Sequence, residues 1–165
     1  MLEEQKQPNT PDSVARRWIE AFNAHDARAI VALYREDAEL FDSGMRRPRR
    51  GRREIENWFR WRFSSTPTIS YIADRVESKD ERRVVVNWIA RGRGPHILGT
   101  NWLDRPFQVD GESVFKIDAG LIEKQRGSYD HLLVLRQIMP VLKRLPKVCA
   151  TMIYSIYMWR KGPRE

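Results

Sequence analysis

The most constraining feature of this sequence is a two-residue alternation of side chains that repeats in its second half. Apolar residues occupy every second position over residues 84–90, and a similar alternation runs over residues 107–117. Side chains of a β-strand point alternately to the two faces of a sheet, so each run predicts a strand with one buried face. The turn sequence Asp118-Ala119-Gly120 then leads into residues 121–130, which predicts a hairpin.

The first half of the chain follows helical spacing instead. Apolar residues recur three and four positions apart in three segments, which are Val14, Trp18 and Phe22; Ile30, Leu33 and Tyr34; and Ile55, Trp58, Phe59 and Phe63. Such a stripe is typical of a helix that packs one face against a core. We expect Asp12 or Ser13 to cap the first helix and Asp26 to cap the second, which should continue through Tyr34.

The order of these elements predicts an α+β fold. Two helices, a strand ending at Asp42, a third helix and a run of antiparallel strands follow one another. We expect a curved antiparallel sheet that wraps around the three N-terminal helices as a cone with an open mouth. The expected organisation is a disordered lead over residues 1–12, one domain over residues 13–139 and a C-terminal extension over residues 140–165.

Composition narrows the cellular setting. No apolar run is long enough to span a membrane as a helix, and the N-terminus lacks the pattern of a signal peptide. Cys149 is the only cysteine, so no disulfide can form within the chain. These features predict a cytoplasmic protein, with membrane-peripheral attachment as an alternative. The net charge of +8 predicts attraction to anions.

Asp42 is the main candidate for chemistry. In an extended chain Ala38, Leu40 and Asp42 share one face, so a carboxylate ends an apolar row at the rim of the interior. Desolvation there would raise the pKa of the carboxyl group and suit it to proton transfer. The alternative is a structural role, in which Asp42 opens an Asp-Ser-Gly turn and bonds to its own backbone.

Five segments carry a family resemblance, and they are residues 18–26, 32–38, 50–59, 118–122 and 129–138. Their order and spacing resemble the nuclear transport factor 2-like superfamily, and within it the SnoaL-type cyclase and ketosteroid isomerase-like branch. The resemblance implies the cone fold and a homodimer. It leaves the activity open, because this fold hosts isomerases, cyclases, dehydratases, epoxide hydrolases and non-catalytic binders.

The resemblance also implies roles for single residues. Asp42 falls where ketosteroid isomerases place their general base. Trp18 falls at the position of their oxyanion-hole tyrosine and Ser113 near their protonated aspartate, so that oxyanion hole is not reproduced. Asp130 falls on the last strand, where SnoaL-type cyclases use an aspartate as acid and base. Asp130 also precedes an apolar helical run, so capping of that helix is the alternative.

The expected activity is cofactor-independent acid/base catalysis on a hydrophobic, carbonyl-containing molecule of the polyketide, terpenoid or steroid kind. Asp42 or Asp130 would remove a proton next to the carbonyl, and isomerisation or ring closure would follow. Trp18, Asn87 or Ser113 would donate a hydrogen bond to the enolate. The residues expected to bind the substrate are Trp18, Phe22, Trp58, Trp88, Ser113, Phe115 and Tyr129.

A non-catalytic ligand-binding or assembly module of the same fold is the alternative to an enzyme. We expect neither a metal nor an organic cofactor. The three histidines, His25, His96 and His131, are scattered along the chain and lack the spacing of metal ligands.

Two basic features lie outside this assignment. Six arginines within residues 46–53 predict an exposed loop, which either serves solubility or attracts a small anion or acidic partner. Nucleic acid is not an expected partner, because the run has no interleaved aromatic residues. Residues 141–161 combine basic positions with an apolar stretch too short to span a bilayer. This tail would pack on a partner subunit, cover the cone mouth, or make peripheral contact with a membrane.

Overall fold

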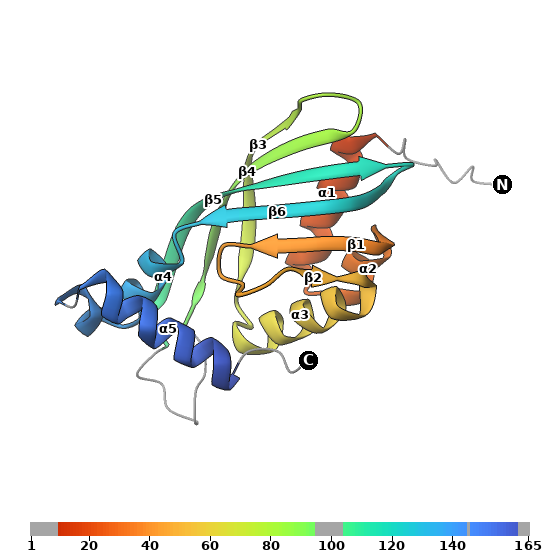
Figure 1. Cartoon of the computed structure of the whole chain (residues 1–165). Coiled ribbons are helices and arrows are strands. Elements are labelled where there is room, and N and C mark those ends of the chain that lie inside the picture. Colours follow the sequence, from red (N-terminus) through yellow and green to blue (C-terminus); the bar gives the residue numbers. More distant parts are fainter. Residues whose placement is uncertain (1–9, 95–103, 145, 162–165) are drawn as a thin grey trace.

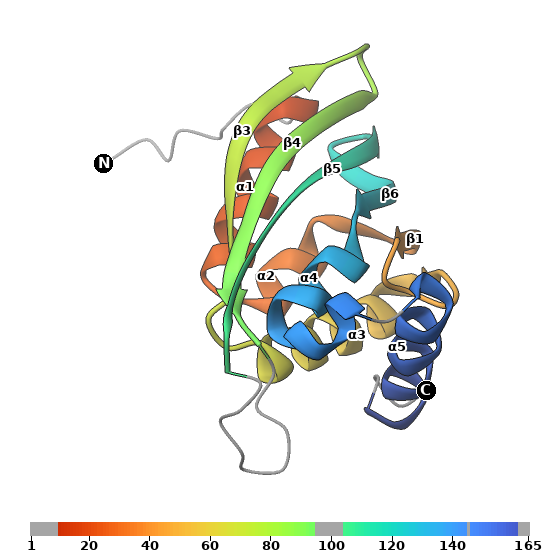
Figure 2. The same ribbon diagram turned by 90° about the vertical axis from the view of Figure 1, so that its left-hand side faces the viewer.

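The computed structural model describes residues 10–94, 104–144 and 146–161. Its strands form one open sheet in the order β2-β1-β6-β5-β4-β3. The strands are β1 Tyr34–Asp42, β2 Arg49–Arg50, β3 Ser70–Ser78, β4 Arg83–Arg93, β5 Pro106–Asp118 and β6 Leu121–Tyr129. The helices are α1 Pro11–Asn23, α2 Ala27–Ala32, α3 Gly51–Ser65, α4 His131–Ile138, the short 3₁₀ helix η1 Pro140–Arg144 and α5 Lys147–Lys161. The sheet curves around the first three helices (Figures 1 and 2).

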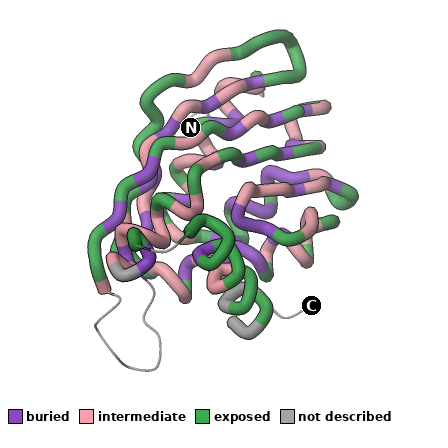
Figure 3. The backbone as a smooth tube through the Cα atoms, turned by 60° about the vertical axis from the view of Figure 1, so that its left-hand side comes forward, coloured by how far each residue is buried: buried purple, intermediate pink, exposed green. Residues whose placement is uncertain are grey.

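The predicted α+β cone is confirmed, and the alternation that predicted its sheet is visible in the burial of the strands. Buried and more exposed residues alternate along β4 and β5, as Figure 3 shows along the tube. The buried row of β4 is Val84, Val86, Trp88 and Ala90. The sheet is mixed instead of purely antiparallel, because β1 pairs in parallel with β6. Two strands so far apart in the chain carry no local signal of their relative direction.

The first helix begins earlier than the sequence pattern suggested. Thr10 is the N-cap, and its side chain accepts a hydrogen bond from the Ser13 N–H at 3.3 Å. Pro11 occupies the first turn, where its missing N–H leaves no helical bond unmade. The expected cap at Asp12 or Ser13 was therefore wrong by two to three positions. Asp12 instead forms an ion pair with Arg16 at 2.7 Å.

The second helix is shorter than expected. It is capped by Asp26 as predicted, but it ends at Ala32, and Tyr34 already belongs to β1. The Leu33 carbonyl accepts the N–H of Ile122 in β6 at 2.7 Å, so sheet pairing captures the chain here. Local helical spacing was overridden by this tertiary contact.

The arginine-rich segment is structured, in contrast to the loop that we expected. Arg49–Arg50 forms β2 on the edge beside β1, and the following residues open α3. Arg47 pairs with Glu54 at 3.0 Å, and Arg52 pairs with Glu36 at 2.6 Å. Part of the basic charge is thus balanced within the domain, by the pairs of Arg47, Arg50 and Arg52.

Helix α4 follows β6, and the C-terminal extension then adds η1 and α5. All three lie at the end of the sheet that carries the β1–β2 loop (Figure 1). The Tyr154 hydroxyl of α5 donates a hydrogen bond to the Gly44 carbonyl at 2.7 Å. One face of the extension therefore packs on its own domain. Among the described helices, none has the length and apolarity needed to cross a membrane. The expected lead over residues 1–12 lies largely outside the described residues, as does His96.

Candidate functional site

A small cavity lies inside the cone, between the end of β1 and helices α1 and α3. Its volume is about 20 Å³, which holds about one water molecule. The lining residues are Trp18, Phe22, Leu40, Asp42, Trp58, Phe59, Arg62, Tyr71, Ser113 and Gln125. Half of these residues are aromatic, and their rings pack closely against one another. The interior is therefore nearly filled by side chains, although polar groups reach it.

Asp42 ends β1 on the same face as Leu40, and its carboxylate lines the cavity. The Oδ1 atom accepts a hydrogen bond from the Gly44 N–H at 2.8 Å. Burial raises the pKa of Asp42 above its ordinary value. The charge of Arg62 and hydrogen bonds from Gly44 and Tyr129 lower this pKa in part. This side chain therefore opens the expected turn and also lines the cavity.

Arg62 brings a positive charge to the same cavity from the third helix. Its guanidinium carbon lies 5.9 Å from the centroid of the Tyr129 ring. Burial alone would lower the pKa of Arg62, but two nearby tyrosines and the Asp42 carboxylate hold it above its usual range. Arg62 is therefore a fixed cation whose planar group can donate several hydrogen bonds.

Tyr129 and Tyr71 add phenol groups to this cluster. Hydrogen bonds between Ser43 and the Tyr129 backbone, at 2.8 and 3.1 Å, hold Tyr129 beside the turn after Asp42. Burial, together with the Asp42 carboxylate, raises the pKa of Tyr129 to about 12, although Arg62 opposes this. Burial likewise raises the pKa of Tyr71. Both phenols keep their protons at neutral pH. The Tyr129 hydroxyl is already hydrogen-bonded to Asp42, whereas Tyr71 lines the cavity.

Trp18 is bonded within the core. Its indole N–H donates to the Tyr34 hydroxyl at 3.0 Å, and this hydroxyl donates in turn to the buried Gln125 side chain. Burial raises the pKa of Tyr34. The Trp18 ring lines the cavity, but the N–H group that we expected to stabilise an enolate already has a partner. Trp18 is therefore placed as a wall residue.

Ser113 and Trp88 form a second buried pair. The Trp88 indole N–H donates to the Ser113 hydroxyl at 3.0 Å, and its ring stacks on Tyr71 with centroids 4.4 Å apart. Ser113 lines the cavity, whereas Trp88 supports the wall from behind. Asn87, the third expected donor, lies on the other face of β4, where it bonds to Glu112. The strand alternation separates it from the cavity.

The remaining predicted binding residues belong to the aromatic packing. Phe22 and Phe115 contact Trp18, with ring centroids 5.3 and 5.4 Å away. Trp58 lines the cavity, and the Arg49 guanidinium lies 5.6 Å from its ring centroid. Phe22 and Trp58 therefore form wall, and Phe115 is fully buried support.

Asp130 lies apart from the cavity. It is exposed and is the N-cap of α4, and its Oδ1 accepts the Leu133 N–H at 3.0 Å. This is the capping geometry that we considered as the alternative to an acid/base role. The structure does not bring Asp130 together with Asp42 in the cavity lining.

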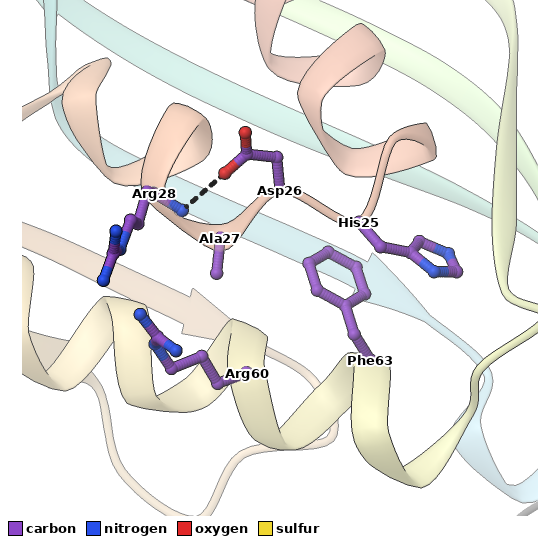
Figure 4. Close-up of a pocket in the computed structure, with 6 residues that line it drawn as sticks. All are labelled: His25, Asp26, Ala27, Arg28, Arg60 and Phe63. Atoms are coloured by element: carbon purple, nitrogen blue, oxygen red, sulfur yellow. Dashed lines mark hydrogen bonds between the residues drawn. The ribbon is translucent and has the colours of Figure 1, made fainter.

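A second, larger hollow lies on the surface between the α1–α2 turn and the end of α3 (Figure 4). It has a volume of about 410 Å³ and is lined by His25, Asp26, Ala27, Arg28, Arg60 and Phe63. His25 bonds to the Ile69 carbonyl at 2.7 Å, and Asp26 caps α2. Polar groups here thus serve local structure. Among the described residues, no three His, Cys, Asp or Glu side chains gather as a metal site.

Sequence reasoning missed Arg62, Tyr71 and Gln125. Arg62 lies seven positions after Ile55, so it falls on the apolar stripe of the third helix. A charged residue on a buried stripe was the available signal. Tyr71 and Gln125 lie on strands whose alternation is less regular, so neither could be assigned to the inner face.

The comparisons with known proteins agree with this geometry. The model of the SnoaL-like domain matches residues 15–125. A protein with a ketosteroid isomerase-like fold from Catenulispora acidiphila, solved with trimethylamine, is 19% identical with a TM-score of 0.67. The match covers 78% of this chain and 92% of that one. No curated protein matches.

Two further solved structures share the fold. A protein of Shewanella putrefaciens assigned to the SnoaL-like polyketide cyclases is 16% identical with a TM-score of 0.66, covering 76% of this chain and 93% of that one. The epoxide hydrolase/cyclase-like enzyme SalBIII, which acts in pyran ring formation in salinomycin, is 19% identical with a TM-score of 0.63. The match covers 73% of this chain and 91% of that one. On the extent of the domain match, this chain belongs to the SnoaL-like domain family.

Proposed function

We propose that this protein is a cofactor-independent acid/base enzyme of the isomerase or cyclase type, acting on a hydrophobic, carbonyl-containing small molecule. The observation that carries the proposal is the Asp42 carboxylate facing an aromatic cavity together with the Arg62 guanidinium. Polyketide cyclases and a cyclase-like enzyme among the structural neighbours support the same reaction class.

The energetics of the cluster support a chemical role over a purely structural one. Burying a carboxylate and a guanidinium side by side costs desolvation energy, and such a pair contributes little net stability compared with apolar residues of similar size. Titratable groups with shifted pKa values are concentrated at functional sites. Burial raises the pKa of Asp42 even with Arg62 nearby. The carboxylate is therefore more basic than an exposed one and better suited to act as a general base.

In the proposed mechanism, Asp42 removes a proton from the carbon next to the substrate carbonyl. The electrons of the C–H bond form an enolate, whose oxygen accepts hydrogen bonds from Arg62 and from the Tyr71 hydroxyl, both of which line the cavity. If the substrate is a β,γ-unsaturated ketone, Asp42 returns the proton at the γ-carbon and the double bond moves. If it carries a second carbonyl, the enolate carbon attacks that carbonyl and closes a ring, and the alkoxide formed takes the proton back from Asp42. The Arg62 and Tyr71 donors replace the Trp18 N–H, which bonds to Tyr34 within the core. The Ser113 hydroxyl accepts from Trp88 and keeps its own O–H as a further donor to the enolate.

The size of the cavity sets a condition on binding. A volume of about 20 Å³ holds water but not a ring system. A multi-ring ligand, which the many aromatic residues suggested, does not fit until wall side chains such as Trp58 move. The carbonyl group is the part of a substrate that would reach Asp42 and Arg62.

The nearly filled interior also favours a second candidate, a non-catalytic module of the same fold. In that case the Asp42 turn and the Arg62 contacts only stabilise the domain. The two candidates differ in whether the carboxylate reacts, so they are separated by a proton-transfer assay.

The test is deuterium exchange at the acidic carbon of hydrophobic ketones dissolved in D₂O, followed by NMR. We expect the native protein to accelerate exchange of at least one ketone, and Asp42→Asn to abolish the acceleration. Asp130→Asn removes an exposed carboxylate and is the matched control, which should keep the native rate. If no ketone exchanges faster than in buffer, the non-catalytic module is the better description.

A further inference from the structure

Helix α5 exposes an apolar stripe. Val148 is 75% exposed, Met152 61%, Ile156 48% and Trp159 73%. Their spacing of four, four and three positions puts them on one face of the helix. Leaving large apolar side chains in water is unfavourable, and a contiguous group of them marks a contact surface.

The opposite face of α5 is held by the domain. Ala150 is completely buried, and the Tyr154 hydroxyl bonds to the Gly44 carbonyl at 2.7 Å. The Tyr154 ring also lies 4.7 Å from the ring of His131. With this face docked, the stripe points outward, in agreement with the exposed stretches of α5 in Figure 3.

The segment that carries the stripe is positively charged. Residues 131–164 contain seven lysines and arginines and no aspartate or glutamate. Lys143, Arg144 and Lys147, which precede the stripe, are exposed. Arg160 and Lys161 follow it in the sequence. Exposed cations thus precede the apolar face, and two more basic residues follow it in the sequence.

We propose that this surface, formed by the stripe and its flanking cations, binds an anionic membrane surface. Apolar side chains enter the boundary between headgroups and acyl chains, while lysines and arginines meet lipid phosphates. Tryptophan, here Trp159, favours that boundary. No described helix is long and apolar enough to cross the membrane, so α5 lies in its plane. The proposal does not depend on chemistry at Asp42.

Other partners fit this surface less well. A second copy of the chain would bring the same cationic segment, so an interface built from two α5 helices would place like charges together. Nucleic acid offers phosphates but no apolar phase, and the stripe itself presents no hydrogen-bond donor except the Trp159 indole. Of these three partners, a lipid surface is the one that matches both the apolar face and the charge.

The experiment is flotation of the full chain with vesicles of phosphatidylcholine, with and without phosphatidylserine. We expect binding to the serine-containing vesicles that weakens with salt, and weak binding to phosphatidylcholine alone. Met152→Ser and Trp159→Ser should each lower the affinity about tenfold. Ile72→Ser, at a similarly exposed apolar residue of β3, should leave it unchanged.

Two charge-reversal variants complete the experiment. Arg144→Glu beside the stripe should weaken binding about fivefold or more. Arg53→Glu makes the same change at an exposed arginine of α3 and should have a clearly smaller effect. Absence of binding by the native chain overturns the proposal, as does equal loss in the Ile72 and Trp159 variants. A dimer that Trp159→Ser converts to monomer, without vesicle binding, would assign the stripe to a second copy.

Discussion

Asp42 and Arg62 line one cavity, the carboxylate from the end of β1 and the guanidinium from α3. Each alters the other, because the Arg62 charge lowers the pKa of Asp42 while the Asp42 charge raises that of Arg62. Burial nevertheless wins at Asp42, whose pKa remains above its ordinary value. The proposed chemistry rests on this balance between desolvation and a nearby cation.

Replacing Arg62 by methionine should raise the pKa of Asp42 further, because burial then acts without the opposing cation. The measurement is a carbon NMR titration of the Asp42 carboxyl group, assigned by its absence in Asp42→Asn. Arg60→Met is the control, since Arg60 lies on the same helix but pairs with Glu56 at the surface. A fall in the pKa of Asp42 in Arg62→Met would contradict the electrostatic assignment.

The pH dependence of stability gives a second prediction. The folded pKa of Asp42 is above its unfolded value, so the native state binds more protons between the two. The contribution of Asp42 to the free energy of unfolding is therefore largest at low pH, and it is lost as the pH rises through the folded pKa. Urea unfolding at a series of pH values should show the native protein losing stability relative to Asp42→Asn over that interval. A relative gain for the native protein would mean that the folded pKa is lowered.

The strand periodicity predicted most of the sheet, because burial of one face leaves a local record in β4 and β5. In the same way, the helical spacing of apolar residues in α3 predicted that Ile55 and Phe63 are buried. The parallel pairing of β1 with β6 left no such record, since it depends on contacts between distant segments. For the same reason, the start of β1 at Tyr34 was hidden within a helical pattern.

The site was predictable in part. Asp42 could be placed at the cavity because it ends an apolar row, and the expected turn is also seen, while its acid/base role stays a prediction. Arg62 was harder to assign to the cavity, because an arginine on a helix usually lies in water. Only its spacing from the apolar residues of α3 places it on the buried face. Whether a cone is hollow or filled depends on side-chain packing, so the small volume of the cavity was not foreseeable from residue types.

Two glycines near the site should respond differently to alanine. A Cβ at Gly111 would lie 2.3 Å from the Trp88 ring, which is bonded to Ser113 and cannot easily retreat. Gly111→Ala should therefore lower the free energy of unfolding by about 1–3 kcal/mol. At Gly127 the nearest atom is Oδ2 of Asp42 at 3.4 Å, an ordinary contact. Gly127→Ala should change the free energy of unfolding by less than about 1 kcal/mol. Urea unfolding of both variants measures the two changes. Equal losses would contradict the packing described here.

The docking of α5 should depend on the Tyr154 hydroxyl. Tyr154→Phe removes its bond to the Gly44 carbonyl and should cost about 0.5–1.5 kcal/mol of stability. Faster amide hydrogen exchange within α5 should accompany this loss. Ser155→Ala, on the exposed side of the helix, should have little effect on either measurement. If both variants exchange alike, α5 is not held by this contact.

The central claim is that the Asp42 carboxylate moves protons, and the most direct measurement is the pH–rate profile of deuterium exchange in a ketone that the native protein activates. The rate should rise with the ionised fraction of Asp42 and level off above its pKa. Asp42→Asn should lower the plateau by about 10²–10⁴-fold and remove the pH dependence, while Asp130→Asn keeps both. An unchanged rate and profile in Asp42→Asn would contradict the account.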